Sequence, residues 1–151
     1  MNRLQGKVAI VTGAAGGFGE GIARLFVAEG AKVLIADLDA DKAQQVAASL
    51  GAQARSVRCD VSKRADIDAA LKACVDAFGA PDIVVNNAGT THRNQSMLDV
   101  DEATFDRVFA VNVKSIYHMT QAVVPLMKAR KSGCIVNIGS TAGIRPRPGL
   151  S

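Results

Sequence analysis

Residues 7–22 constrain the fold of this chain most strongly, because a strand, a glycine-rich turn and a helix follow one another there without a gap. Val8–Val11 is a short apolar run rich in β-branched residues, which is typical of an inner strand of a parallel sheet. Five glycines stand among the nine residues from Gly13 to Gly21, so the backbone can turn sharply and approach a ligand closely. The N-terminus of the following helix presents free N–H groups and partial positive charge, which suit a pyrophosphate. A tight strand-to-helix connection that binds nothing is the alternative interpretation.

The composition describes a globular protein and argues against two classes of partner. With 151 residues, of which 48% are hydrophobic and 21% charged, the chain is long enough for one domain with its own core. No apolar run approaches the roughly 18–20 residues of a membrane span, so we expect no membrane contact. The net charge of +4 is scattered along the chain and aromatic residues make up only 4%, which argues against a nucleic-acid partner.

The cysteines and the N-terminal residues indicate the cellular compartment in which we expect the protein. Cys59, Cys74 and Cys134 are far apart and form no C-x-x-C pair, so the sequence predicts neither a metal site nor a disulfide framework. The six residues before Lys7 leave no room for a signal peptide. We therefore expect a protein of the reducing cytoplasm.

Apolar strands alternate with amphipathic helices along the whole chain. This alternation predicts right-handed crossovers and an α/β fold of the Rossmann type, a doubly wound parallel sheet with strand order 3-2-1-4-5 that stops after the fifth strand. We expect a single dinucleotide-binding domain over residues 1–151 that is incomplete at the C-terminus. The expected strands are 8–11, 32–36, 55–59, 83–85 and 134–138, and the expected helices after the first are 42–50, 63–78 and 101–130.

Asp37 ends the second expected strand and lies 18 residues after Gly19, close to the spacing at which an acid meets the adenosine ribose in dinucleotide folds. Its carboxylate would accept hydrogen bonds from the 2′ and 3′ hydroxyls and would repel a 2′-phosphate. Like charges 4–5 Å apart cost about 1–4 kcal/mol, and no Lys or Arg stands in the glycine turn or in Leu38–Asp41 to offset this. The prediction is NAD as the cofactor, with NADP disfavoured. The alternative is a solvated Asp that begins a turn.

Three further strand ends carry polar residues. Asp60, followed by Val61, would accept a hydrogen bond from an adenine amino group or would cap the next helix; the sequence favours neither. The run Asn86–Gly89 ends a buried strand with two amides, which are costly to bury unless hydrogen-bonded, and its small residues leave room for a cofactor. Ser140 would donate to a substrate oxygen or would be a turn residue.

Taken together, these motifs resemble the short-chain dehydrogenase/reductase family in order and spacing. The motifs that carry the resemblance are Thr12-Gly13-x-x-x-Gly17-x-Gly19, Asp37, Asp60-Val61, Asn86-Asn87-Ala88-Gly89, Asn112 and Ser140. The resemblance covers essentially the whole chain. It implies an oxidoreductase that transfers hydride between NAD(P) and a small-molecule secondary alcohol or ketone.

The resemblance also implies roles for individual residues. Asn112 would hold a water molecule in a proton relay, Ser140 would orient the substrate oxygen, and no metal would take part. The implied cofactor-binding residues are Thr12, Gly13, Gly17, Phe18, Gly19, Asp37, Asp60, Val61, Asn86, Asn87, Ala88 and Gly89. The complete protein would be a homo-oligomer, a dimer or tetramer, in which the 101–130 stretch contributes to the interface.

One expected motif of the family is absent from these residues. The family's general acid/base is a Tyr about 13 residues beyond the Ser, in a Tyr-x-x-x-Lys pair, and that position lies just beyond Ser151. The only tyrosine is Tyr117, and Gln121 rather than Lys stands four residues later, so we interpret Tyr117 as a packing residue. The sequence thus resembles the first three-fifths of a family member, and we predict that these 151 residues alone are inactive. The alternative function is a non-catalytic fragment that binds a dinucleotide or a partner protein.

Overall fold

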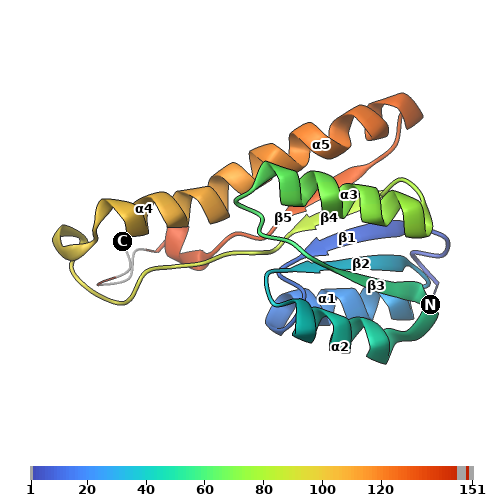
Figure 1. The fold of residues 1–151 in the computed structure, drawn as a ribbon, viewed down its shortest axis with the longest axis horizontal. Coiled ribbons are helices and arrows are strands. Elements are labelled where there is room, and N and C mark those ends of the chain that lie inside the picture. Colours follow the sequence, from blue (N-terminus) through green and yellow to red (C-terminus); the bar gives the residue numbers. More distant parts are fainter. Residues whose placement is uncertain (1, 146–148, 150–151) are drawn as a thin grey trace.

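The computed structural model describes residues 2–145 and 149, which build a five-stranded sheet with helices on both faces (Figure 1). The strand order is β3-β2-β1-β4-β5, as predicted, and each neighbouring pair is parallel. The order reverses between β1 and β4, and a crevice at the carboxyl ends of the strands is expected beside such a switch point. The strands are β1 (Val8–Thr12), β2 (Lys32–Asp37), β3 (Ala54–Arg58), β4 (Ile83–Asn86) and β5 (Cys134–Asn137).

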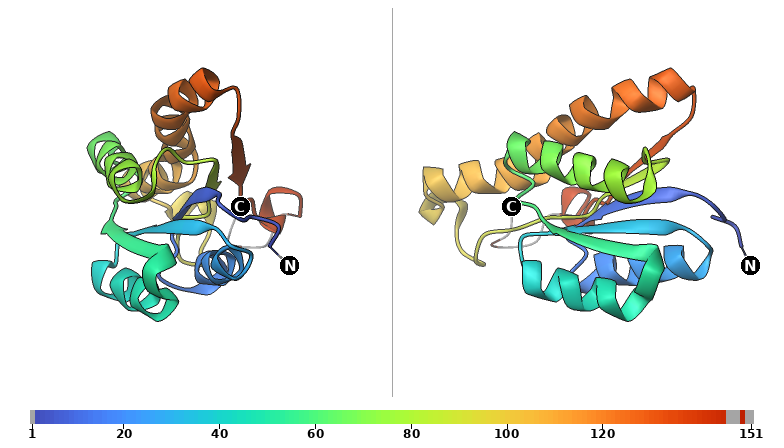
Figure 2. Two further views of the ribbon diagram at one scale, coloured as in Figure 1. Left: turned by 90° about the vertical axis from the view of Figure 1, so that its right-hand side faces the viewer. Right: turned by 45° about the vertical axis from the view of Figure 1, so that its right-hand side comes forward.

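Alternate residues of the strands face two separate cores. On one face, Ile10 and its neighbours pack against α3 (Arg64–Phe78) and α5 (Ser115–Arg130). On the other, Val11 and its neighbours pack against α1 (Gly17–Ala28) and α2 (Ala40–Leu50), so the sheet lies between two helical layers (Figures 1 and 2). Within the described residues, three short helical turns lie in the connections: η1 (Gly51–Gln53), η2 (Met97–Asp99) and η4 (Thr141–Gly143).

The expected continuous helix over residues 101–130 is wrong in its middle. It consists of α4 (Glu102–Phe109), a π-helical turn η3 (Ala110–Lys114) and α5. The wide turn coincides with Asn112, whose side chain leaves the helix to bond the chain beyond β4: Oδ1 accepts from the Thr90 N–H at 2.8 Å, and Nδ2 donates to the Thr90 carbonyl at 2.8 Å. A π turn of this kind accommodates an extra residue and re-aims a side chain.

The helices after β4 are covered less completely than the rest. Figure 1 shows α4 extending beyond the ends of the strands. Tyr117 at the start of α5 is 59% exposed, so its interpretation as a packing residue is wrong. The physical reason is that α5 faces the core through Met119 and Val123, which lie on the opposite side of the helix.

Among residues 2–145 and 149, no helix combines the length and the apolar character that crossing a membrane requires.

Candidate functional site

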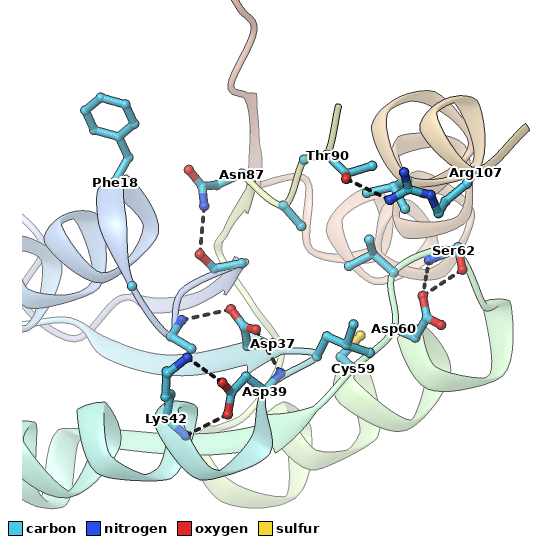
Figure 3. Close-up of a pocket in the computed structure, with 18 residues that line it drawn as sticks. Phe18, Asp37, Asp39, Lys42, Cys59, Asp60, Ser62, Asn87, Thr90 and Arg107 are labelled. Atoms are coloured by element: carbon cyan, nitrogen blue, oxygen red, sulfur yellow. Dashed lines mark hydrogen bonds and ion pairs between the residues drawn. The ribbon is translucent and has the colours of Figure 1, made fainter. Parts of the chain in front are cut away.

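A cavity of about 730 Å³ opens at the carboxyl ends of the strands, beside the point where the strand order reverses. Its walls come from the segments that follow β1, β2, β3 and β4, together with α4 and η3 (Figure 3). The lining residues are Gly13, Ala15, Gly16, Phe18, Asp37, Leu38, Asp39, Lys42, Cys59, Asp60, Val61, Ser62, Asn87, Ala88, Gly89, Thr90, Arg107 and Val111.

The glycine turn forms one wall of this cavity because its backbone packs where no side chain fits. A Cβ on Gly19 would lie 2.2 Å from the Gly13 carbonyl oxygen and 2.5 Å from Asn87 Nδ2. Gly17 has φ +56°, a conformation that favours glycine. No side chain caps the N-terminus of α1 at Gly16, so N–H groups of its first turn are left for an anion. These features fit a pyrophosphate.

Thr12 and Asn87 tie the glycine turn to the end of β4. Thr12 is buried, and its Oγ1 accepts from the N–H groups of Asn87 (3.0 Å) and Ala88 (3.1 Å). Asn87 Nδ2 donates to the carbonyls of Thr12 (2.9 Å) and Gly13 (3.0 Å). Asn87, one of the two amides that are costly to bury without partners, is half-buried, and its N–H groups are satisfied by the turn itself, which joins the two walls.

Asp37 faces the cavity from the end of β2. Its Oδ2 accepts from the Ala15 N–H at 2.9 Å and its Oδ1 from the Asp39 N–H at 3.0 Å, so the carboxylate braces the glycine turn and begins the next turn. Both backbone bonds leave acceptor capacity, because a carboxylate offers about four lone-pair sites. Asp37 can therefore still accept from hydroxyl groups of a ligand.

The chain matches known proteins over nearly its whole length. The profile of the family described as short chain dehydrogenase matches residues 7–151. The chain is 50% identical to 4-formylbenzenesulfonate dehydrogenase TsaC1/TsaC2 of Comamonas testosteroni, over 98% of this chain and 60% of that protein. It is 45% identical to galactitol 2-dehydrogenase of Agrobacterium fabrum, over 95% of this chain and 56% of that protein.

A solved structure agrees with these relatives. The crystal structure of 3-ketoacyl-(acyl-carrier-protein) reductase from Brucella melitensis complexed with NADH superposes with a TM-score of 0.93 at 46% identity, covering 97% of this chain and 62% of that one. The chain belongs to the short-chain dehydrogenase family. It spans about three-fifths of the length of these relatives.

In this family member, Asp60 lies at the cavity without capping the helix that follows it. Its Oδ1 accepts from the Ser62 hydroxyl at 2.6 Å and from the Ser62 N–H at 3.1 Å, and the hydroxyl bond is the main reason that the pKa of Asp60 is lowered. The residue at the N-cap of α3 is Lys63, which makes no side-chain cap bond. Of the two alternatives, the capping role is not what the structure shows, and an ionised carboxylate faces the cavity beside Val61.

Cys59 contributes a neutral surface to the same wall. Burial, followed by the nearby carboxylates of Asp66 and Asp60, raises the pKa of the Cys59 thiol to about 12. The thiol therefore stays protonated at neutral pH and acts as a small apolar group.

Several residues of the family pattern do not line the cavity. Asn86 and Asn87 point in different directions, as successive strand residues do: Asn86 Nδ2 donates to Asn137 Oδ1 at 2.8 Å across β4 and β5. Ser140 caps η4, its Oγ accepting from the Ala142 N–H at 3.1 Å, which matches the turn-residue alternative. The sequence-predicted residues that do not line the cavity are Thr12, Gly17, Gly19, Asn86, Asn112 and Ser140.

The structure also brings residues to the cavity that the sequence interpretation did not include. Lys42 and Arg107 are its two basic lining residues among those that the structure describes. Arg107 Nη1 donates to Thr90 Oγ1 at 3.2 Å. A single basic residue on a helix gives no signal in the sequence, whereas Asp39 and Leu38 adjoin a strand end and could have been included on that ground. The other lining residues that the sequence interpretation did not include are Ala15, Gly16, Cys59, Ser62, Thr90 and Val111.

Proposed function

We propose that this chain forms the cofactor-binding part of an oxidoreductase that transfers hydride between NAD and a secondary alcohol or ketone. The observation that carries the proposal is the cavity at the strand ends, with a carboxylate at one wall and an uncapped helix N-terminus at another. Two of the similar proteins are dehydrogenases and the similar solved structure contains NADH, which supports the same chemistry.

The preference for NAD over NADP rests on Asp37. Its carboxylate lies at the cavity, where it would accept from the ribose hydroxyls and repel a 2′-phosphate. The ligand-binding roles that we propose follow the walls: the first turn of α1 for the pyrophosphate, Asp60 and Val61 for the adenine, and Asn87–Gly89 as the floor beneath the cofactor. The nicotinamide ring, when bound, supplies the hydride acceptor or donor.

For the substrate we propose a small molecule that carries the alcohol or ketone. Ser140 would orient the substrate oxygen once released from its turn, and Asn112 would keep Thr90 in place beside the reacting centre. We propose no nucleic-acid or membrane partner and no catalytic metal, and we place the protein in the cytoplasm, where its three cysteines would stay reduced.

We further propose that these 151 residues alone turn over no substrate, because the Tyr-x-x-x-Lys pair is absent from them. General acid/base catalysis is typically worth about 10²–10⁴ in rate. The test is a chimaera in which the C-terminal two-fifths of the TsaC1/TsaC2 dehydrogenase is fused behind this chain, assayed for alcohol-dependent NADH formation. We expect activity from the chimaera, none from the 151 residues, and loss of activity when Ser140→Ala is introduced. Turnover by the 151 residues alone would contradict the proposal.

The second candidate, a non-catalytic binding fragment, is favoured by one observation. Phe105, Phe109, Val113 and Tyr117 recur every four residues from α4 to α5 and are 43%, 51%, 56% and 59% exposed. Such a stripe suits contact with another protein. In the non-catalytic alternative it would bind a partner protein, whereas in the enzyme we propose that a second copy of the complete protein covers it in a homo-oligomer. Stable NAD binding by a chimaera that stays inactive with every alcohol and ketone would favour the non-catalytic function.

A further inference from the structure

Lys42 brings a positive charge to the same end of the cavity as Asp37. It stands in the first turn of α2 and lines the cavity together with Leu38 and Asp39. Figure 3 draws Lys42 beside Asp39 and below Asp37, whereas the other basic lining residue, Arg107, lies on the far side near Thr90 and Ser62. Of the two basic lining residues, Lys42 is therefore the one on the Asp37 side of the cavity.

The structure shows that this ammonium group is already engaged. Lys42 Nζ lies 2.8 Å from Asp39 Oδ2, and the Lys42 N–H donates to Asp39 Oδ1 at 3.1 Å. The pair holds the pKa of Asp39 below and that of Lys42 above its usual range, so both groups are ionised. Asp37 and Asp39 together outnumber the single cation, and this end of the cavity is net negative.

We propose that Asp39 is a second cofactor-selectivity residue, which excludes a 2′-phosphate by occupying the ammonium group of Lys42 and adding a negative charge beside Asp37. This inference rests on the proposed function, since it concerns how the same cavity distinguishes NAD from NADP. It assigns the selectivity to a three-residue arrangement in which Asp37 meets the ribose and Asp39 withholds the cation.

Asp39 and Lys42 can be substituted with little effect on the stability of the fold. The Lys42 and Asp39 side chains are 68% and 43% exposed, and exposed pairs contribute little to stability. Asp39 also caps α2, but Asp39→Asn retains an oxygen that can accept from the Lys42 N–H and removes only the charge. Asp41→Asn is the matched control, because Asp41 lies in the same first turn and does not line the cavity.

The experiment titrates the full 151-residue chain with AMP and with adenosine 2′,5′-bisphosphate by isothermal calorimetry. Asp39→Asn should raise the affinity for the bisphosphate relative to AMP by about three- to tenfold, because the freed ammonium can pair with the 2′-phosphate. Adding Lys42→Met to Asp39→Asn should abolish the gain, Asp41→Asn should leave the ratio within about twofold, and raised salt should shrink the gain.

The outcomes separate this inference from the function on which it rests. If the unmodified chain binds AMP but Asp39→Asn leaves the ratio unchanged, the role of Asp39 is refuted and the cofactor site stands. The role is also refuted if Lys42→Met alone weakens bisphosphate binding severalfold, because Lys42 would then already be a phosphate ligand. If the unmodified chain binds neither nucleotide, the proposed function fails and the inference fails with it.

Discussion

The segment from β1 to α2 and the segment from α4 to η4 differ in how completely their side chains are buried and hydrogen-bonded. Every residue of β1 is buried, and the Thr12 hydroxyl is hydrogen-bonded to Val85 in β4 and to Asn87 and Ala88 just beyond it. In β5, by contrast, Val136 is 40% exposed, and the stripe from Phe105 to Tyr117 lies open along α4 and α5. The cavity wall around the glycine turn is thus held by its own hydrogen bonds, whereas the later segment presents apolar surface that the described residues do not cover.

The largest predicted contrast is in thiol reactivity, between Cys134 in the later segment and two cysteines in the well-covered part of the chain before α4. Cys134 begins β5 and is exposed, while Cys59 and Cys74 are buried, and burial raises the pKa of each to about 12. With a disulfide reagent at pH 8, Cys134 should react at least about 1,000-fold faster than the other two, whose reaction needs the core to open. Peptide mapping of the labelled protein measures this, and equal labelling of all three thiols would refute the contrast.

The same two buried thiols predict the sign of a pH effect. A thiol with a raised folded-state pKa contributes stability that is fully present below its ordinary pKa and is lost as the pH rises through the raised value. The free energy of unfolding should therefore fall between about pH 9 and pH 12. Replacing Cys59 and Cys74 by Ala should flatten this part of the pH profile in urea titrations, and an unchanged slope would contradict the assignment.

Glycine-to-alanine substitutions at two positions of α1 test whether the close packing of the glycine turn requires glycine at position 19. Gly19→Ala places a methyl group 2.2 Å from the Gly13 carbonyl oxygen, so it should lower the free energy of unfolding by about 1–3 kcal/mol and weaken NAD binding. A Cβ on Gly21 has no other atom within 4 Å, so Gly21→Ala should raise the free energy of unfolding by up to about 1 kcal/mol. Urea denaturation gives both values. If the two variants were equally stable, the close approach of Gly19 to Gly13 would not be a real constraint.

Register partners on β4 and β5 extend the comparison to the core. Val85 and Val136 are paired across the two strands, yet Val85 is 2% exposed and Val136 40%. Val85→Ala should cost about 2 kcal/mol of unfolding free energy and Val136→Ala less than about 1 kcal/mol, because only the first leaves a cavity. A cost for Val136→Ala as large as that for Val85→Ala would show that β5 is covered in solution.

The smallest expected effect concerns the hydrogen bonds between Asn112 and Thr90. Asn112→Ala removes both, and should cost about 1 kcal/mol and speed hydrogen exchange at the Thr90 amide. Asn112→Asp keeps the Oδ1 acceptor and should protect that amide better than Ala does. Unchanged exchange in both variants would mean that Asn112 does not hold the loop.

The strand order and much of the cavity wall could be predicted from the sequence, because both follow from local pattern. Alternating apolar strands and helices dictate the topology, and Asp37 is marked by its place at a strand end. The family resemblance places Asn86 and Asn87 at the cofactor together, although the two-residue period of a strand already implies that neighbouring side chains face opposite ways. Lys42 could not be found, since only the packing of α2 on the sheet carries it to the cavity.

The α4–α5 region shows a different limit. Its helical pattern predicts where the chain is helical, but Tyr117 faces outward because the described residues cover only one side of α5. The π turn likewise coincides with a tertiary contact, the hydrogen bonds between Asn112 and Thr90, which leave no local pattern in the sequence.

We propose that this chain holds an NAD-selective site governed by the Asp37 carboxylate at the end of β2. The most direct test is to titrate the 151-residue chain with NAD and with NADP, alone and as Asp37→Asn. We predict that NAD binds about tenfold more tightly than NADP, since a like charge beside the 2′-phosphate costs on the order of 1–4 kcal/mol, and that Asp37→Asn narrows the gap. If NADP bound to the unmodified chain as tightly as NAD, the selectivity that we assign to Asp37 would be refuted.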